Sequence, residues 1–164
     1  MSAVAVATRN ADVFVEQERV APIVAAVDAS AAGRAAVGEA VRLGLELSAP
    51  VVFVYVRRGP ARFFGAPVYQ RRLTEEMARA RGVLDRAVAV ATSAGVATEA
   101  EILEGSPRRR IAEFARDREA RLVVVGSRRR TLGPSVSTAV VRTAGPPVVV
   151  ARDSERLAVA WKGT

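Results

Sequence analysis

One stretch of the sequence combines a glycine, several hydroxyls and a run of arginines in a pattern that suits anion binding. Its candidate residues are Gly126, Ser127, Arg129, Ser135, Val136 and Ser137. The serines are placed to open a helix, and the free backbone N–H groups at a helix N-terminus bind anions. Arginine grips phosphate through two parallel hydrogen bonds. The residues indicate an anion site, while an ordinary serine cap in a solvated basic loop explains the same composition.

Asp28 is a second candidate because it directly follows a short apolar run. A carboxylate at such a strand end can accept hydrogen bonds from a ribose hydroxyl or an adenine amine. It can also serve only to complement the dipole of the helix that follows. The position of Asp28 alone leaves both interpretations open.

Arg108, Arg109 and Arg110 form another basic run, in the first turn of a predicted helix. Positive charge at a helix N-terminus opposes the helix dipole, so the run is mildly unfavourable unless an acidic group binds. From the sequence, we interpret these three side chains as part of a solvated face.

The residues that are missing exclude several kinds of chemistry. The chain has neither cysteine nor histidine, which excludes disulfides, thiolate or imidazole metal sites and every triad with a histidine base. Lys162 is the single lysine, so a P-loop lysine is excluded as well. We therefore expect a protein that is not an enzyme and holds no metal, or at most a slow nucleotide hydrolase.

The net charge of +8 makes nucleic acid an obvious partner to consider. The sequence has no helix-turn-helix spacing and no aromatic residues interleaved with basic ones, so we expect no specific nucleic-acid binding. No apolar run approaches the roughly 18 residues of a membrane span, and the start of the chain lacks the basic region of a signal peptide. We expect a cytoplasmic protein of about one domain, without a membrane partner.

The pattern of elements predicts an α/β fold. Five predicted strands alternate with four predicted helices, and the strands cover residues 23–27, 51–56, 96–104, 122–125 and 147–150. Most are apolar without alternation, which is typical of strands buried on both faces of a parallel sheet. Strand 96–104 alternates apolar with charged residues, which indicates an edge strand. Right-handed crossovers then give a doubly wound, Rossmann-like sheet with helices on both faces, and ligands bind at its carboxyl edge near Asp28, Arg57 and Gly126.

Apolar residues at helical spacing mark the predicted helices. These residues are Ala36, Ala40, Leu43 and Leu47 in the first helix, Leu73, Met77, Ala80, Leu84, Ala87 and Ala91 in the second, and Ile111, Phe114 and Ala115 in the third. Capping residues and helix breakers then indicate where these helices begin and end. Gly95 stops the second helix, and Ser106 and Pro107 open the third as N-cap and first helical residue. Residues 57–70 contain two glycines and two prolines and are predicted to form a loop.

From about Pro22 to Arg152 the chain resembles the universal stress protein family. The matching segments are Val27-Asp28-Ala29-Ser30 (the family's V-D-x-S), Val54-Tyr55-Val56-Arg57, Glu104-Gly105-Ser106-Pro107 (its G-[DSN]-P), 123–128, 135–137 and 147–150. The resemblance implies a five-stranded sheet in the order 3-2-1-4-5, a dimer and, in one subgroup, ATP binding through the signature G-x-x-G-x(9)-G-[ST]. Segment 1–20 is then an N-terminal arm, 21–152 the domain and 153–164 a C-terminal tail.

The resemblance also implies which residues contact a nucleotide. Asp28, Val56 and Gly126 occupy the positions of the adenine and ribose contacts. Arg129 and Pro134 stand where the signature has its second and third glycines, Ser135 matches the hydroxyl, and the loop is shorter. The nucleotide-binding set is therefore Asp28, Val56, Gly126, Ser127, Arg129, Ser135, Val136 and Ser137, with ATP or AMP bound weakly.

Two functions from different classes follow. The first is a stress-response protein with a degenerate adenine-nucleotide site. The second is an interaction module of the same fold that binds no nucleotide, dimerises and docks a protein partner. Both include a homodimer through the fifth strand, because 147–150 is apolar on both faces and lies at an edge, and bare apolar edges invite pairing.

Overall fold

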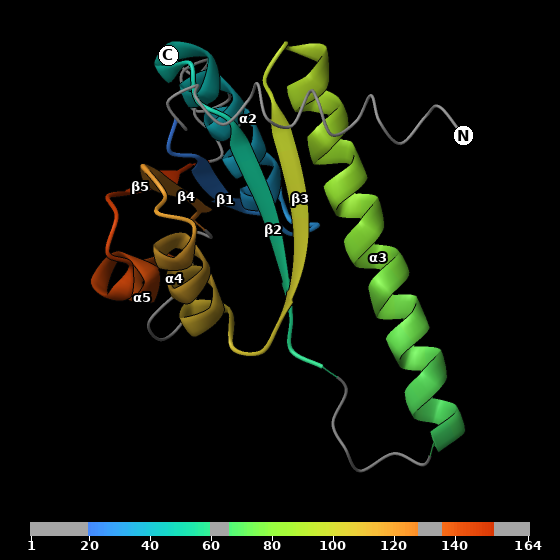
Figure 1. Cartoon of the computed structure of the whole chain (residues 1–164). Coiled ribbons are helices and arrows are strands. Elements are labelled where there is room, and N and C mark those ends of the chain that lie inside the picture. Colours follow the sequence, from blue (N-terminus) through green and yellow to red (C-terminus); the bar gives the residue numbers. More distant parts are fainter. Residues whose placement is uncertain (1–19, 60–65, 128–135, 153–164) are drawn as a thin grey trace, which may run out of the picture.

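The computed structural model describes residues 20–59, 66–127 and 136–152 (Figure 1). The strands are β1 (Ile23–Ala26), β2 (Val51–Arg57), β3 (Thr98–Glu104), β4 (Leu122–Gly126) and β5 (Val148–Ala151). The helices are α2 (Ala31–Leu47), α3 (Ala66–Ser93), α4 (Pro107–Asp117) and α5 (Val136–Thr143). Nearly all of the predicted arm and the whole predicted tail lie outside the described residues.

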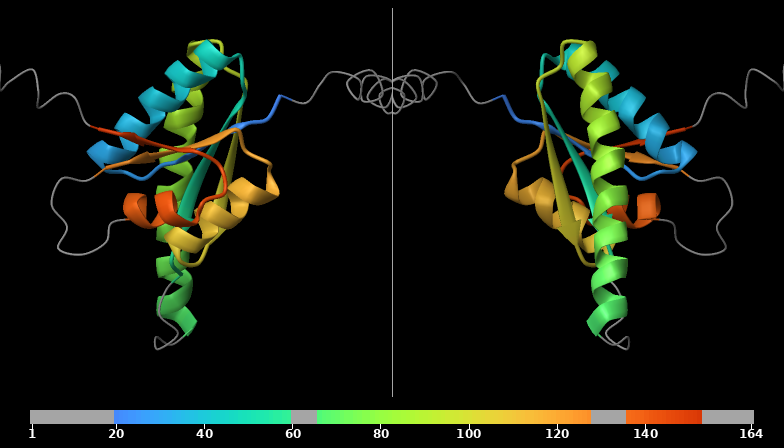
Figure 2. Two further views of the ribbon diagram at one scale, coloured as in Figure 1. Left: turned by 90° about the vertical axis from the view of Figure 1, so that its left-hand side faces the viewer. Right: turned by 90° about the vertical axis from the view of Figure 1, so that its right-hand side faces the viewer.

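All five strands form one parallel sheet in the order β3-β2-β1-β4-β5, which confirms the predicted fold class and strand order. Ile23 at the start of β1 lies opposite Val51 of β2 and Leu122 of β4. Helices α2 and α3 cover one face of the sheet, and α4 and α5 cover the other (Figure 2). The sheet therefore lies between two helical layers, with an aliphatic core on each face.

Helix α2 approaches the sheet most closely through its small residues. Ala36 and Ala40 are fully buried, as predicted. Leu43 and Leu47 also pack against this core, as predicted, but they are less buried than Ala36 and Ala40. Gly44 is buried between them, and a Cβ there would lie 3.0 Å from side-chain carbons of Val51 and Val96, so a larger side chain would not fit.

The outer face of α2 holds a small ion-pair network. Arg42 donates hydrogen bonds to Glu39 at 2.6 and 3.1 Å and to Glu46 at 2.6 Å. The hydrogen bond from Arg42 holds the pKa of Glu39 below its usual range. These groups are exposed, so they support the helix only modestly.

Helix α3 begins earlier than the sequence predicts. Residues 66–70 belong to the helix, so the predicted loop 57–70 is wrong at its C-terminal end. The sequence places Pro67 in a loop, but proline is well tolerated in the first turn of a helix because the N–H group it lacks would have no partner there. The first buried residue of α3 is Ala80, and the turns before it extend past the end of the sheet (Figure 1). Gly95 follows the helix with φ +82°, as expected of a stop residue.

The two edge strands differ in character. β3 lies at one edge of the sheet, as predicted, and its Glu99 and Glu101 form ion pairs with Arg118 at 3.1 and 3.3 Å. β5 lies at the other edge, and its Val150 is 37% exposed, so the described residues leave an apolar side chain accessible at this edge. Ser106 sits at the N-cap of α4, but its side chain makes no capping hydrogen bond.

Candidate functional site

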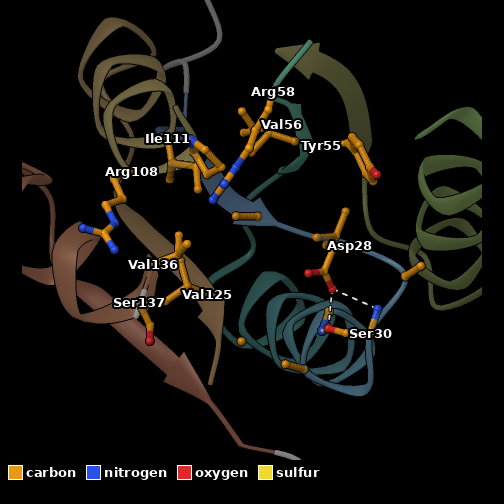
Figure 3. Close-up of a pocket in the computed structure, with 18 of the residues that line it drawn as sticks. Asp28, Ser30, Tyr55, Val56, Arg58, Arg108, Ile111, Val125, Val136 and Ser137 are labelled. Atoms are coloured by element: carbon orange, nitrogen blue, oxygen red, sulfur yellow. Dashed lines mark hydrogen bonds between the residues drawn. The ribbon is translucent and has the colours of Figure 1, made fainter. Parts of the chain in front are cut away.

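A pocket of about 760 Å³ opens at the carboxyl end of the sheet, where β1 and β4 lie side by side (Figure 3). From β1 the chain crosses to β2 on one side, and from β4 it crosses to β5 on the other side. The neighbouring strands β1 and β4 therefore form a switch point in the strand order, and the loops that follow them diverge and leave a crevice. The floor is apolar and consists of Val54, Val56, Ile111, Val125 and Val136. The polar and charged lining consists of Asp28, Ser30, Ser137, Arg58, Glu76, Arg79 and Arg108.

Asp28 lines this pocket and also organises the start of α2. Its Oδ1 accepts hydrogen bonds from the backbone N–H of Ser30 at 2.9 Å and from the Ser30 hydroxyl. The hydroxyl oxygen of Ser30 accepts in turn from the N–H of Gly33 at 3.1 Å. A Cβ on Gly33 would lie 2.7 Å from the backbone nitrogen of Asp28, so Gly33 lets the turn fold tightly. The two interpretations of Asp28 are therefore compatible, because the same carboxylate supports the helix and faces the pocket.

Gly126 has a structural role that the sequence did not indicate. A Cβ at this position would lie 2.9 Å from the Cβ of Ala32 and would overlap the Ala32 carbonyl group. The end of β4 can therefore pack against the first turn of α2 only if residue 126 has no side chain. Gly126 also lines the pocket, so close approach of a ligand and close approach of α2 both favour glycine here.

The other predicted site residues divide into three groups. Val56, Val136 and Ser137 line the pocket, and Ser137 is almost completely buried. Ser127 follows β4, donates its N–H to the carbonyl of Ala151 at 2.9 Å, and is not part of the lining. Arg129 and Ser135 lie outside the described residues. The structure thus brings together five of the eight predicted residues, from the ends of β1, β2 and β4 and the start of α5.

Several lining residues were missed by sequence reasoning. The sequence pointed to Arg57 at the carboxyl edge, but Arg57 turns away to ion-pair with Glu104 and, at 3.9 Å, with Glu76. Because side chains alternate along a strand, Arg58 lies on the same side as Val56 and lines the pocket instead. The sequence could have indicated Arg58, because it lies two residues after the predicted site residue Val56 and therefore on the same side of the strand. Nothing in the sequence showed that Glu76 and Arg79 reach the pocket, because that depends on how far α3 extends.

The surroundings of the pocket favour an anionic ligand. The first turns of α2, α4 and α5 all contribute lining residues, so three helix N-termini direct their partial positive charge toward it. Arg58, Arg79 and Arg108 add three full positive charges, against the carboxylates of Asp28 and Glu76. Among the described residues no cluster of carboxylates suits a metal ion. In the same part of the chain, none of the helices is both long and apolar enough to cross a membrane.

Comparison with known proteins agrees with this architecture. The profile of the universal stress protein family matches residues 20–152. The fold is similar to a universal stress protein from Archaeoglobus fulgidus, with 25% identity, TM-score 0.69, and 85% of this chain and 98% of that chain covered. It is also similar to the universal stress protein UspA from Lactobacillus plantarum, with 27% identity, TM-score 0.71, and coverage of 83% and 100%.

A third similar structure contains a nucleotide. It is a universal stress protein from Archaeoglobus fulgidus in complex with dAMP, with 27% identity, TM-score 0.65, and 82% of this chain and 99% of that chain covered. Among curated proteins, none shows significant similarity to this chain.

Proposed function

Because this chain belongs to the universal stress protein family, we propose that it is a cytoplasmic stress-response protein that binds an adenine nucleotide weakly and catalyses no reaction. The pocket at the switch point carries the proposal. It places Asp28 beside an apolar floor that includes Val56, and three arginines outnumber the two carboxylates in its lining. The dAMP complex of the Archaeoglobus fulgidus protein supports an adenine nucleotide as the class of ligand.

The loop after β4 is the reason to expect weak binding of ATP. Pro134 has no N–H to offer a phosphate, and Arg129 brings a side chain where the family signature has a glycine. A hydrogen bond to a charged group contributes roughly 1.5–3 kcal/mol, so the loss of two would weaken affinity by about 10² to 10⁴. AMP and adenosine depend less on the outer phosphates and should lose less affinity than ATP, relative to a protein with the full signature.

Calorimetry with ATP, AMP and adenosine tests the site through Asp28. We expect Asp28→Asn to weaken AMP and adenosine binding by about tenfold, because an amide loses the charge-assisted hydrogen bonds of a carboxylate but keeps an acceptor for Ser30. Asp85→Asn, an exposed position on α3, is the matched control and should change nothing. Tight ATP binding that Asp28→Asn leaves unchanged would contradict both the site and the loop argument.

The interaction module remains a second candidate, because the described residues leave an apolar side chain accessible at the edge of β5. We propose that two copies pair along this edge to form a homodimer. Val150 is 37% exposed there, so Val150→Lys should convert the dimer to monomers by placing a charge in the interface. Light scattering at micromolar concentration measures the mass, and Val90→Lys on α3, where Val90 is 50% exposed, is the control. A wild-type monomer at that concentration would refute the dimer and remove the main support for this candidate.

A further inference from the structure

The three arginines at the start of α4 have different environments. Arg109 is 70% exposed and forms an ion pair with Glu113 at 3.5 Å. Arg110 donates a hydrogen bond to the same carboxylate at 2.7 Å, and its aliphatic part covers Gly105. Arg108 is exposed, as the sequence analysis predicted, but it also lines the pocket. The solvated-face interpretation therefore fits Arg109, whereas Arg108 belongs both to the exposed surface and to the pocket lining.

Arg108 is placed at one end of the pocket and Asp28 at the other. Figure 3 shows Arg108 on α4 at one side of the pocket and Asp28 at the start of α2 on the other side. Arg58, at the end of β2, lies beside Val56. A phosphate near Asp28 would be repelled by the carboxylate. If the nucleoside of the ligand contacts Asp28, this repulsion favours a binding mode in which the phosphate lies away from Asp28, on the α4 side.

Two of the three helix N-termini at the pocket lie on the α4 side. Helices α4 and α5 both begin at the pocket, because their first residues, Pro107, Arg108, Val136 and Ser137, line it. A cation in the first turn of α4 is disfavoured by the helix dipole. A bound phosphate would offset that cost, because it would interact favourably with the guanidinium and with both helix N-termini.

We propose that Arg108, assisted by Arg58, binds the phosphate of a nucleoside monophosphate and makes the pocket selective for the nucleotide over the free nucleoside. This inference rests on the proposed adenine-nucleotide site and assigns its phosphate end. It places the phosphate beside Arg108, at the N-termini of α4 and α5. The ligand class is a phosphate monoester of an adenine nucleoside.

The test compares AMP and adenosine by calorimetry on matched arginine variants. Arg108→Gln should weaken AMP roughly five- to tenfold, a range reduced for the exposure of the side chain, and leave adenosine within about twofold. Arg109→Gln removes the same charge from the neighbouring position outside the pocket lining and should affect neither ligand. Because the interaction is ionic and exposed, the Arg108→Gln effect should shrink as salt is raised. Arg58→Gln should show the same selective loss to a smaller degree.

The outcomes separate this inference from the proposed function. If the wild type binds adenosine and AMP equally, or if Arg108→Gln weakens AMP no more than Arg109→Gln, the assignment of the phosphate end is wrong while the nucleotide site stands. If the wild type binds neither ligand, the proposed function fails and the assignment fails with it. Equal losses of AMP and adenosine in Arg108→Gln also overturn the assignment, because they indicate a general disturbance of the pocket.

Discussion

Gly126→Ala is expected to destabilise the protein by about 3 kcal/mol or more, whether or not a ligand is present. The added methyl group would overlap the carbonyl group of Ala32, which is backbone and cannot rotate away. The first turn of α2 must then shift off the end of β4, and Ala32, now buried, must be partly exposed. Urea denaturation of the unliganded protein measures the effect as a lower midpoint with an unchanged slope.

Gly145→Ala is the control for that experiment. The nearest atoms to a Cβ at Gly145 are side-chain carbons of Arg116, at 3.5 Å or more, which is ordinary contact. We expect its stability to stay within about 0.5 kcal/mol of the wild type. If Gly126→Ala is as stable as Gly145→Ala, the contact between α2 and β4 does not require a glycine at position 126. The role of Gly126 would then be limited to ligand binding.

Gly33→Ala and Gly38→Ala should change stability in opposite directions, although both lie in α2. At Gly33 a Cβ would lie 2.6 Å from Oδ1 of Asp28 and 2.7 Å from its backbone nitrogen, so the turn that carries Asp28 must open. At Gly38 nothing lies within 4 Å of the added atom. We expect Gly33→Ala to lower the free energy of unfolding by about 2 kcal/mol, after the better helix propensity of alanine is taken into account. We expect Gly38→Ala to raise the free energy of unfolding by up to about 1 kcal/mol.

Thermal denaturation shows whether each variant is more or less stable than the wild type, and AMP calorimetry shows whether its affinity for the ligand changes. Because Gly33→Ala displaces Asp28, it should also weaken AMP, whereas Gly38→Ala should leave affinity unchanged. A destabilised Gly33→Ala protein that binds AMP with wild-type affinity would show that Asp28 supports the helix without contacting the ligand.

The fold could be predicted because its signals are local. Unbroken apolar runs marked the central strands, the charges of Glu99 and Glu101 marked an edge, and Gly95 marked the end of a helix. The start of α3 could not be predicted, because Pro67 suits a loop and a first helical turn equally well. Leu43 and Leu47 pack against the core as predicted, but how deeply they are buried could not be predicted, because periodicity gives the direction of a helix face and not its distance from the sheet.

The site could be predicted only where strand ends define it. Asp28 and Gly126 follow buried strands, and the carboxyl ends of parallel strands meet at one edge, so their proximity followed from the topology. The predicted stripe of Ile111 and Ala115 fixes the rotation of α4 and turns Arg109 away from the sheet, but it does not show that Arg108 reaches the pocket, which depends on where the helix begins relative to the strand ends. The tight packing of Gly126 on Ala32 depends likewise on a contact between segments far apart in the chain.

The strand order also determines when each edge of the sheet can be covered while the chain is being synthesised. β1 is made first, yet it lies at the centre, between β2 and β4. Once Glu104 has emerged from the ribosome, β1, β2 and β3 can pair and α2 and α3 can cover one face. At about 5–20 residues per second, the further 20 or so residues to the middle of β4 take roughly one to four seconds. During that interval the three paired strands expose the apolar edge of β1 to solvent, and that is the stage at which a chaperone or a second nascent chain would compete with β4.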